Sequence, residues 1–128
     1  MVVLYVDPNP ESRARRVNLL VRAGLTVYEA DSPESAAHIA QQLKELDVMV
    51  SEGVLDEDFT GFELRDAIRK RFPAMRTIFT SRFDLTGFEE QVDGCVLFFE
   101  PVDEELLLRN VQQTQPTVPG QTVPAESR

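Results

Sequence analysis

The chain of 128 residues lacks tryptophan and has one cysteine, Cys95, and one histidine, His38. A single cysteine excludes an internal disulfide bond, so we expect a reducing, cytoplasmic setting in which Cys95 is a buried and inert thiol of an inner strand. His38 has no Asp, Cys or second His at ligand spacing and is expected on an exposed helix surface. Because no motif places a histidine base beside Ser51 or Ser81, a serine hydrolase has little support.

Basic residues and long apolar runs are also scarce. The chain has 13 Lys and Arg residues but 22 Asp and Glu residues. The resulting net charge of −9 argues against nucleic acid and anionic membranes as partners. No apolar run approaches the roughly 20 residues of a membrane span. The residues before Asp7 contain no Lys or Arg, whereas a signal peptide begins with a basic region, so no signal peptide is predicted. Pro8-Asn9-Pro10 replaces the glycine-rich loop that dinucleotide, P-loop and flavin sites need, so no cofactor is expected.

Short β-branched runs alternate with longer stretches of helical spacing. Strands are predicted at 2–6, 26–30, 47–51, 76–81 and 95–99. Helices are predicted to begin after Asn9, Ser32 and Asp103, with others at 62–72 and, weakly, at 86–92. Apolar strands separated by helices predict an α/β fold of the flavodoxin-like (βα)5 type, a doubly wound, five-stranded parallel sheet in the order 2-1-3-4-5.

Helical spacing also predicts which residues face the core. In the first helix these are Ala14, Val17, Leu20 and Val21, with Gly24 ending the helix. In the third helix they are Leu64, Ala67, Ile68 and Phe72. After Gln113 the composition becomes polar and proline-rich, so we expect a domain at 1–113 and a flexible tail or linker at 114–128.

Five local motifs resemble, in order and spacing, the receiver domains of two-component response regulators. They are Leu4-Tyr5-Val6-Asp7 with Pro10 and Arg13; Asp47-Val48-Met49-Val50-Ser51-Glu52; Gly61-Phe62-Glu63-Leu64; Ile78-Phe79-Thr80-Ser81; and Glu100-Pro101 followed by Asp103-Glu104-Glu105-Leu106-Leu107. The resemblance covers about residues 2–112. It implies a phosphoacceptor aspartate, two acids that help to hold Mg²⁺, a hydroxyl and a lysine that stabilise the phosphoryl oxygens.

The chain departs from this pattern at three positions. The second acid is replaced by Pro8, the phosphoacceptor by Glu52 and the lysine by Glu100, whereas Asp7 and Thr80 remain. The loop after Glu52 is one residue longer than the usual pattern. The resemblance therefore implies a degenerate phosphoacceptor site that has lost its catalytic and metal-binding function.

Three carboxylates, those of Asp7, Glu52 and Glu100, are expected to converge without a lysine. Two like charges about 4 Å apart repel by roughly 4 kcal/mol at an effective dielectric constant near 20. We therefore expect one carboxylate to be protonated or to pair with Arg13 or Arg82. Glu52 is open to two interpretations, a built-in mimic of the phosphorylated state or drift in an unused site.

A switch aromatic is also missing at the matching position of the fifth strand. The residue three before Glu100 is Leu97, which implies that the relay between acceptor site and output face is absent. A shift of one residue in the alignment would bring Phe98 to this position.

The surface that receivers commonly use for partners lies on the fourth helix, fifth strand and fifth helix. Here it is predicted to contain Phe88, Phe99, Leu106 and Arg109. The run Leu106-Leu107-Leu108 exceeds what one inward helix face requires, so we expect a protein partner on this face, a second copy of the chain included. Ordinary core packing is the alternative.

Asp56, Glu57 and Asp58 form an acidic cluster for which a solvated loop is favoured over a metal site. Together these features predict a phosphorylation-independent pseudo-receiver, a non-enzymatic docking or dimerisation module in bacterial-type signalling. The first alternative is an atypical receiver that another ligand or partner switches. A small enzyme on a flavodoxin-like fold is a more distant one.

Overall fold

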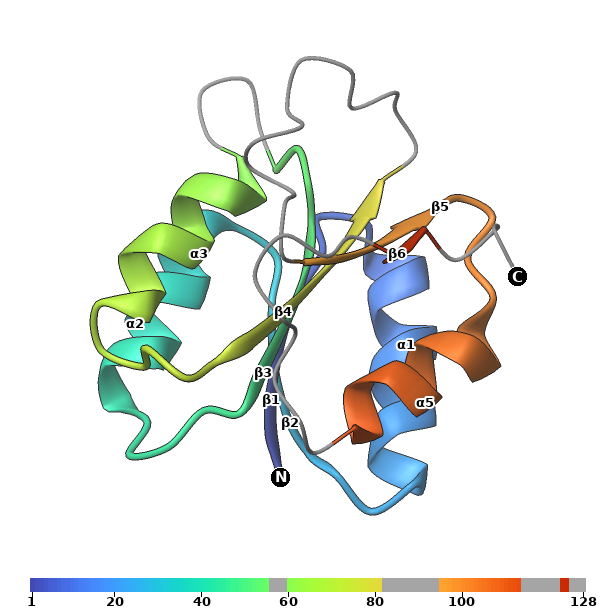
Figure 1. Cartoon of the computed structure of the whole chain (residues 1–128), viewed down its shortest axis with the longest axis horizontal. Coiled ribbons are helices and arrows are strands. Elements are labelled where there is room, and N and C mark those ends of the chain that lie inside the picture. Colours follow the sequence, from blue (N-terminus) through green and yellow to red (C-terminus); the bar gives the residue numbers. More distant parts are fainter. Residues whose placement is uncertain (56–59, 82–94, 114–122, 125–128) are drawn as a thin grey trace.

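The computed structural model describes residues 1–55, 60–81, 95–113 and 123–124. Its five main strands are β1 (Val2–Val6), β2 (Thr26–Ala30), β3 (Val48–Glu52), β4 (Arg76–Ser81) and β5 (Val96–Phe99). They form a parallel sheet in the order β2-β1-β3-β4-β5, which confirms the predicted topology (Figure 1). A two-residue strand, β6 (Val123–Pro124), pairs with β5 in parallel. This strand lies in the segment predicted to be a tail, so the domain boundary at residue 113 remains a prediction.

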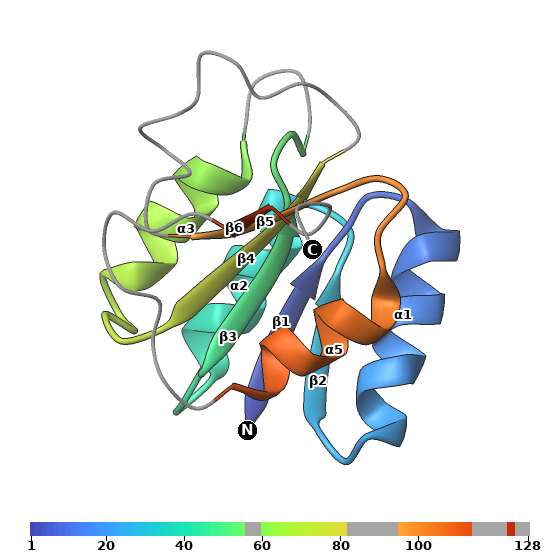
Figure 2. The same ribbon diagram turned by 45° about the vertical axis from the view of Figure 1, so that its right-hand side comes forward.

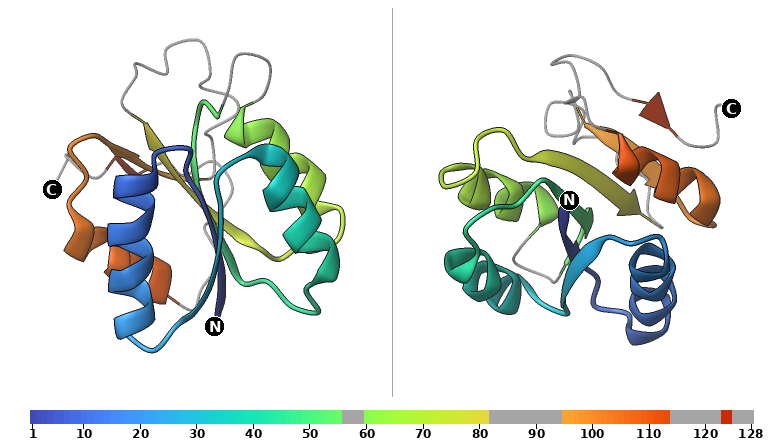
Figure 3. Two further views of the ribbon diagram at one scale, coloured as in Figure 1. Left: turned by 180° about the vertical axis from the view of Figure 1, so that it is seen from behind. Right: turned by 90° about the horizontal axis from the view of Figure 1, so that it is seen from below.

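Four helices of the described ranges cover the sheet: α1 (Pro10–Arg22), α2 (Pro33–Gln42), α3 (Gly61–Arg69) and α5 (Glu104–Gln112). Figures 2 and 3 show α1 and α5 on one face of the sheet and α2 and α3 on the other. This is the doubly wound arrangement that right-handed crossovers produce. The helix predicted at 86–92 lies outside the described residues.

Side-chain caps explain where the helices begin. The side chains of Asn9, Ser32 and Asp103, the three predicted caps, accept hydrogen bonds from backbone N–H groups of the first turn. Helix α3 starts one residue earlier than predicted because Thr60 and Glu63 form a capping box. It also ends at Arg69 rather than at residue 72, since residues 70–72 form a turn.

The strands alternate their side chains between two cores. Val3 and Tyr5 face α1 and α5, whereas Leu4 and Val6 face α2 and α3. All four side chains are at most 1% exposed, so β1 is buried on both faces, as its continuous apolar sequence predicts. The same division continues through β3, β4 and β5.

The predicted inward faces of two helices need correction. On α1, Val17 and Leu20 are buried, but Ala14 and Val21 are exposed, and Ser12 and Arg16 are buried instead. Periodicity counts only apolar residues, and it cannot foresee that Ser12 and Arg16 find hydrogen-bond partners inside the fold. Gly24, which has a φ of 91°, follows the Ala23 cap and ends the helix as expected.

The inward face of α3 differs in the same way. Leu64 and Ile68 are buried as predicted, and Phe72 packs partly against the core beyond the end of the helix. Ala67 is exposed, whereas Arg65 is buried with its guanidinium over the ring of Phe79, 5.6 Å from the ring centroid. A cation over an aromatic face is stabilised there, so this arginine replaces the expected alanine in the interface.

Candidate functional site

The carboxyl ends of the strands bring the five predicted site positions to one edge of the sheet. Glu52 pairs in register with Thr80, and Val6, which precedes Asp7, pairs with Ser51. The backbone N–H of Glu100 donates to the carbonyl of Ser81 at 2.8 Å. This edge is where doubly wound folds form their sites.

Asp7 is 1% exposed, and hydrogen bonds within its own loop use both of its carboxylate oxygens. Oδ1 accepts the backbone N–H of Asn9 at 2.9 Å, and Oδ2 accepts the hydroxyl of Ser12. The neighbouring Pro8 is exposed and has no side-chain oxygen. Asp7 therefore orders the turn into α1, and Pro8 cannot supply the second carboxylate that a hard cation would need at this end of β1.

Glu52 and Thr80 are both buried, at 5% and 2% exposure. The backbone around Glu52 is held closely. The N–H of Gly53 donates to the carbonyl of Thr80 at 2.9 Å, and the hydroxyl of Ser51 donates to the carbonyl of Glu52, also at 2.9 Å. The predicted phosphoacceptor position, Glu52, is thus an enclosed carboxyl group at the end of an inner strand.

Gly61 allows α3 to approach this site. A Cβ atom at this position would lie 2.2 Å from the carbonyl oxygen of Glu52 and 2.8 Å from the Oγ of Ser51. Only glycine permits such close contact between a helix and a strand backbone. Gly61 thereby places the first turn of α3 directly against the acceptor position.

Glu100, at the lysine position, forms an ion pair with Arg16 of α1. Nη2 of Arg16 donates to both carboxylate oxygens of Glu100, at 2.6 and 3.0 Å. Nε of Arg16 donates to Glu104 at 3.2 Å, and Arg15 donates to the same carboxylate at 2.8 Å. The side chain of Arg16 is 3% exposed and that of Glu100 is 20% exposed. The ion pair therefore joins α1 to the connection between β5 and α5.

This ion pair corrects the predicted pairing. Arg13 does not neutralise a site carboxylate: its Nη1 donates to the backbone carbonyl of Asp7 at 2.8 Å and its Nε to Glu29 at 3.0 Å. Arg82 lies outside the described residues. Sequence reasoning missed Arg16, although a cation one turn beyond Arg13 is a signal that could have been used, because residues at this spacing share a helix face.

Burial and neighbouring charges fix the protonation states beside the ion pair. Burial raises the pKa of the Tyr5 phenol above its ordinary value, with small contributions from Asp7 and Glu52. Burial also opposes the charge of Arg16, but Tyr5 and Glu100 outweigh it and raise the pKa of the guanidinium. Arg16 is therefore permanently cationic and Tyr5 neutral at physiological pH.

Leu97, the predicted switch position, is 5% exposed and belongs to the core beneath α2 and α3. It pairs in register with Phe79, one residue before Thr80. Phe98, the alternative position, is fully buried in the opposite core, beneath α1 and α5.

The predicted partner face has mixed exposure. Phe99 and Leu106 are half-buried and pack against the cores, whereas Arg109 is exposed and lies 3.9 Å from Glu105. Leu108 is also half-buried against a core. Phe88 lies outside the described residues. The use of this face for a partner remains a prediction.

Three smaller predictions can be compared with the structure. Cys95 is buried, at 1% exposure, and His38 is exposed on α2, both as expected. The acidic cluster at 56–58 lies outside the described residues. Within the described ranges, no three His, Cys, Asp or Glu residues are grouped in a way that could hold a metal ion. No helix in these ranges is long and apolar enough to cross a bilayer.

Comparison with solved structures identifies the fold. A response regulator receiver protein from Sinorhizobium medicae superposes with a TM-score of 0.80 at 18% identity, covering 88% of this chain and 92% of that one. The chemotaxis response regulator CheY4 of Vibrio cholerae gives 0.73 at 25% identity, with coverages of 87% and 95%. A CheY-like receiver domain protein from Methanospirillum hungatei gives 0.75 at 18% identity, with coverages of 87% and 90%.

The chain therefore has the receiver-domain fold, a flavodoxin-like α/β fold, with its parallel sheet in the order β2-β1-β3-β4-β5. No family model and no curated protein matches its sequence. At these sequence identities, the likeness shows the fold alone. Because a fold hosts many functions, the finer role has to be argued from the site.

Proposed function

We propose that this protein is a phosphorylation-independent pseudo-receiver, a non-enzymatic module that docks a protein partner in two-component signalling. The observation that carries the proposal is the ion pair between Arg16 and Glu100. A receiver resemblance implies a lysine at position 100 that faces the phosphoryl group. A carboxylate stands there instead, and an arginine from α1 holds it.

Electrostatics supports the loss of phosphoryl chemistry. A phosphoryl donor is anionic, and it would meet the buried Glu52 and Asp7 without the family's lysine. Pro8 offers no side-chain ligand, so a divalent cation at the end of β1 would find the carboxylate of Asp7 without a second acid beside it, and that carboxylate already accepts hydrogen bonds from Asn9 and Ser12.

A fixed conformation follows from the same contacts. The guanidinium of Arg16 donates to Glu100 and Glu104, and removal of one partner of a buried ion pair leaves an uncompensated charge. The ion pair thus favours a single arrangement of α1, the end of β5 and α5. A constitutive docking surface needs such an arrangement, whereas a switch needs two of similar free energy.

The test uses amide NMR spectra of the protein with Mg²⁺ and either acetyl phosphate or beryllofluoride. We expect no saturable shifts at Gly53, Thr80 or Ser81. A saturable response there would overturn the proposal and favour the rival, an atypical receiver that remains switchable.

A matched control variant reintroduces the side chains that the receiver resemblance implies for phosphorylation. The variant Pro8→Asp/Glu52→Asp/Glu100→Lys supplies the three missing groups, with Arg16→Gln added so that the new lysine does not face the guanidinium. This variant is expected to respond to beryllofluoride. If it responds and the natural chain does not, the three substitutions account for the loss.

A further inference from the structure

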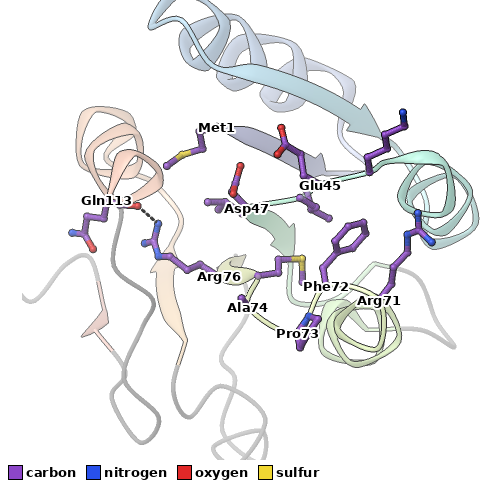
Figure 4. Close-up of a pocket in the computed structure, with 13 residues that line it drawn as sticks. Met1, Glu45, Asp47, Arg71, Phe72, Pro73, Ala74, Arg76 and Gln113 are labelled. Carbon is purple, nitrogen blue, oxygen red and sulfur yellow. Dashed lines mark hydrogen bonds between the residues drawn. The ribbon is translucent and has the colours of Figure 1, made fainter.

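The edge of the sheet opposite the candidate site contains a groove of about 690 Å³, lined where β3 and β4 begin and where α3 ends (Figure 4). This volume is within the range of about 300–1,000 Å³ that is typical of ligand sites. Leu46 and Met75 contribute an apolar floor, at 5% and 2% exposure. Phe72 packs partly against the core, and its ring points into the groove in Figure 4.

Cations without a carboxylate partner gather around this groove. Of the 13 Lys and Arg residues of the chain, all but Arg82 and Arg128 lie in the described ranges. Arg13, Arg15, Arg16, Arg65 and Arg109 form ion pairs. The described cations that no described carboxylate approaches within 4.0 Å are Arg22, Lys44, Arg69, Lys70, Arg71 and Arg76.

Except for Arg22, these unpaired cations line the groove or come just before a lining residue in the chain. Lys44, Arg71 and Arg76 line it. Arg69 donates to the carbonyl of Met75, a lining residue, at 3.5 Å, and Lys70 lies between Arg69 and Arg71 in the chain. Arg71 also donates to the carbonyl of Leu43 at 2.7 Å, which holds the two sides of the rim together.

The acidic residues that line the groove are fewer than the cations. Glu45 and Asp47 line it, and Oδ2 of Asp47 accepts the backbone N–H of Val2 at 2.7 Å. Three cations and two carboxylates therefore line the groove, and Arg69 and Lys70 precede the lining residue Arg71, in a protein whose net charge is −9. The excess of positive charge is local and is greatest beside the end of α3.

We propose that this groove docks an acidic peptide segment of a partner protein, with one or two apolar side chains on the floor and carboxylates against Lys44, which lines the groove, and Lys70, which precedes the lining residue Arg71. The apolar floor favours apolar side chains of the peptide as anchors, and the unpaired cations favour acidic residues on either side of them. A nucleic acid fits less well, because its phosphates would meet the negative charge of the remaining surface. The inference gives the proposed docking function a surface, and it rests on that function.

The test is a titration with the peptide acetyl-Glu-Glu-Asp-Leu-Phe-Asp-Glu-Glu-amide, followed by amide NMR shifts and, with a fluorescein label, by anisotropy. We expect saturable shifts at Leu46, Phe72 and Met75, with a dissociation constant of about 0.1–1 mM. Lys44→Glu and Lys70→Glu should each weaken binding about 3- to 10-fold. The matched control Arg22→Glu changes the charge by the same amount at an exposed, unpaired cation, and should alter binding less than about 2-fold.

Several results would overturn the groove proposal. One is an absence of amide shifts at up to about 1 mM peptide. Another is that Arg22→Glu weakens binding as much as Lys44→Glu or Lys70→Glu. A third is that binding is undiminished when Ser-Ser replaces Leu-Phe in the peptide. Shifts centred on Phe99, Leu106 and Arg109 would move docking to the other face, and tighter binding of single-stranded DNA would change the class of partner. These outcomes are independent of the beryllofluoride experiment, so failure here leaves the loss of phosphorylation to be decided by that test.

Discussion

Nη2 of Arg16 lies 2.6 Å from Oε1 of Glu100, and this contact joins the first helix to the end of the fifth strand. A pocket of about 460 Å³ lies beside this ion pair, between the start of α1 and Pro101. The glutamate predicted at the lysine position of the receiver pattern thus has an ion-pair partner, Arg16, on helix α1. The charge reversal at position 100 is therefore part of the fold's own network of interactions.

Breaking the pair should destabilise the protein. We expect Glu100→Ala to lower the free energy of unfolding by about 2–4 kcal/mol, less than the full cost of a broken buried pair, because Arg16 keeps Glu104. Urea denaturation followed by circular dichroism measures this. Arg15→Ala is the control, since its side chain is 57% exposed and should cost under about 1 kcal/mol. Equal costs for the two variants would contradict the role given to Arg16.

Gly61 should tolerate no side chain. In Gly61→Ala the new Cβ would meet the backbone oxygen of Glu52 at 2.2 Å, so α3 or β3 must shift, at a cost of about 1–3 kcal/mol or more. Gly24→Ala is the comparison, because no atom lies within 4 Å and only its φ of +91° is unfavourable, at about 1 kcal/mol. Thermal unfolding should rank Gly61→Ala as the more destabilised. The reverse order would contradict the close approach of α3 to Glu52.

Tyr5 should resist ionisation while the protein is folded. Because burial raises the folded pKa of Tyr5 above the unfolded value of 10.0, the folded state keeps its proton where the unfolded state loses it. Stability is thus unaffected by Tyr5 below pH 10 and falls as the pH rises above it.

The variant Tyr28→Phe leaves Tyr5 as the only tyrosine, so absorbance near 295 nm reports Tyr5 alone. We expect tyrosinate to form together with the loss of far-ultraviolet circular dichroism. Tyrosinate that forms at pH 10 in a folded protein would contradict the burial of the phenol.

Arg76 should hold the end of α5. Its guanidinium donates to the carbonyls of Asn110 and Gln113 at 2.8 and 2.9 Å, where helix carbonyls otherwise lack partners. Burial disfavours the charged form of the guanidinium and lowers the pKa of Arg76. Arg76→Met should cost about 2–4 kcal/mol and speed amide exchange at the end of α5. Arg22→Met, at an exposed arginine of α1, should change neither measurement.

The sequence predicts the fold well because its signals are local. β-branched runs mark the strands, and the caps Asn9, Ser32 and Asp103 mark three helix starts. The five strands match the predicted ranges to within one residue at each end. The predicted bounds of α3 are wrong at both ends, because a capping box sets its start and a turn sets its end.

The site was predicted only in part. The strand pattern predicts that Asp7, Glu52 and Glu100 follow strands, and the receiver resemblance implies that Thr80 lies near them. The structure places these residues at one edge of the sheet. The partner of Glu100 was not predicted correctly, since Arg13 and Arg16 lie on adjacent turns and only the crossing of α1 over the end of β5 selects between them.

Local patterns in the sequence predict the order of the strands and of the described helices, and the burial of β1 and Cys95. The receiver resemblance implies that Pro8, Glu52 and Glu100 replace three chemical groups. The packing of the elements, in contrast, shows that Arg16 pairs with Glu100, that Gly61 lies against Glu52 and that cations without a carboxylate partner line one groove. Such contacts join residues far apart in sequence, and their geometry exists only once the helices have packed on the sheet.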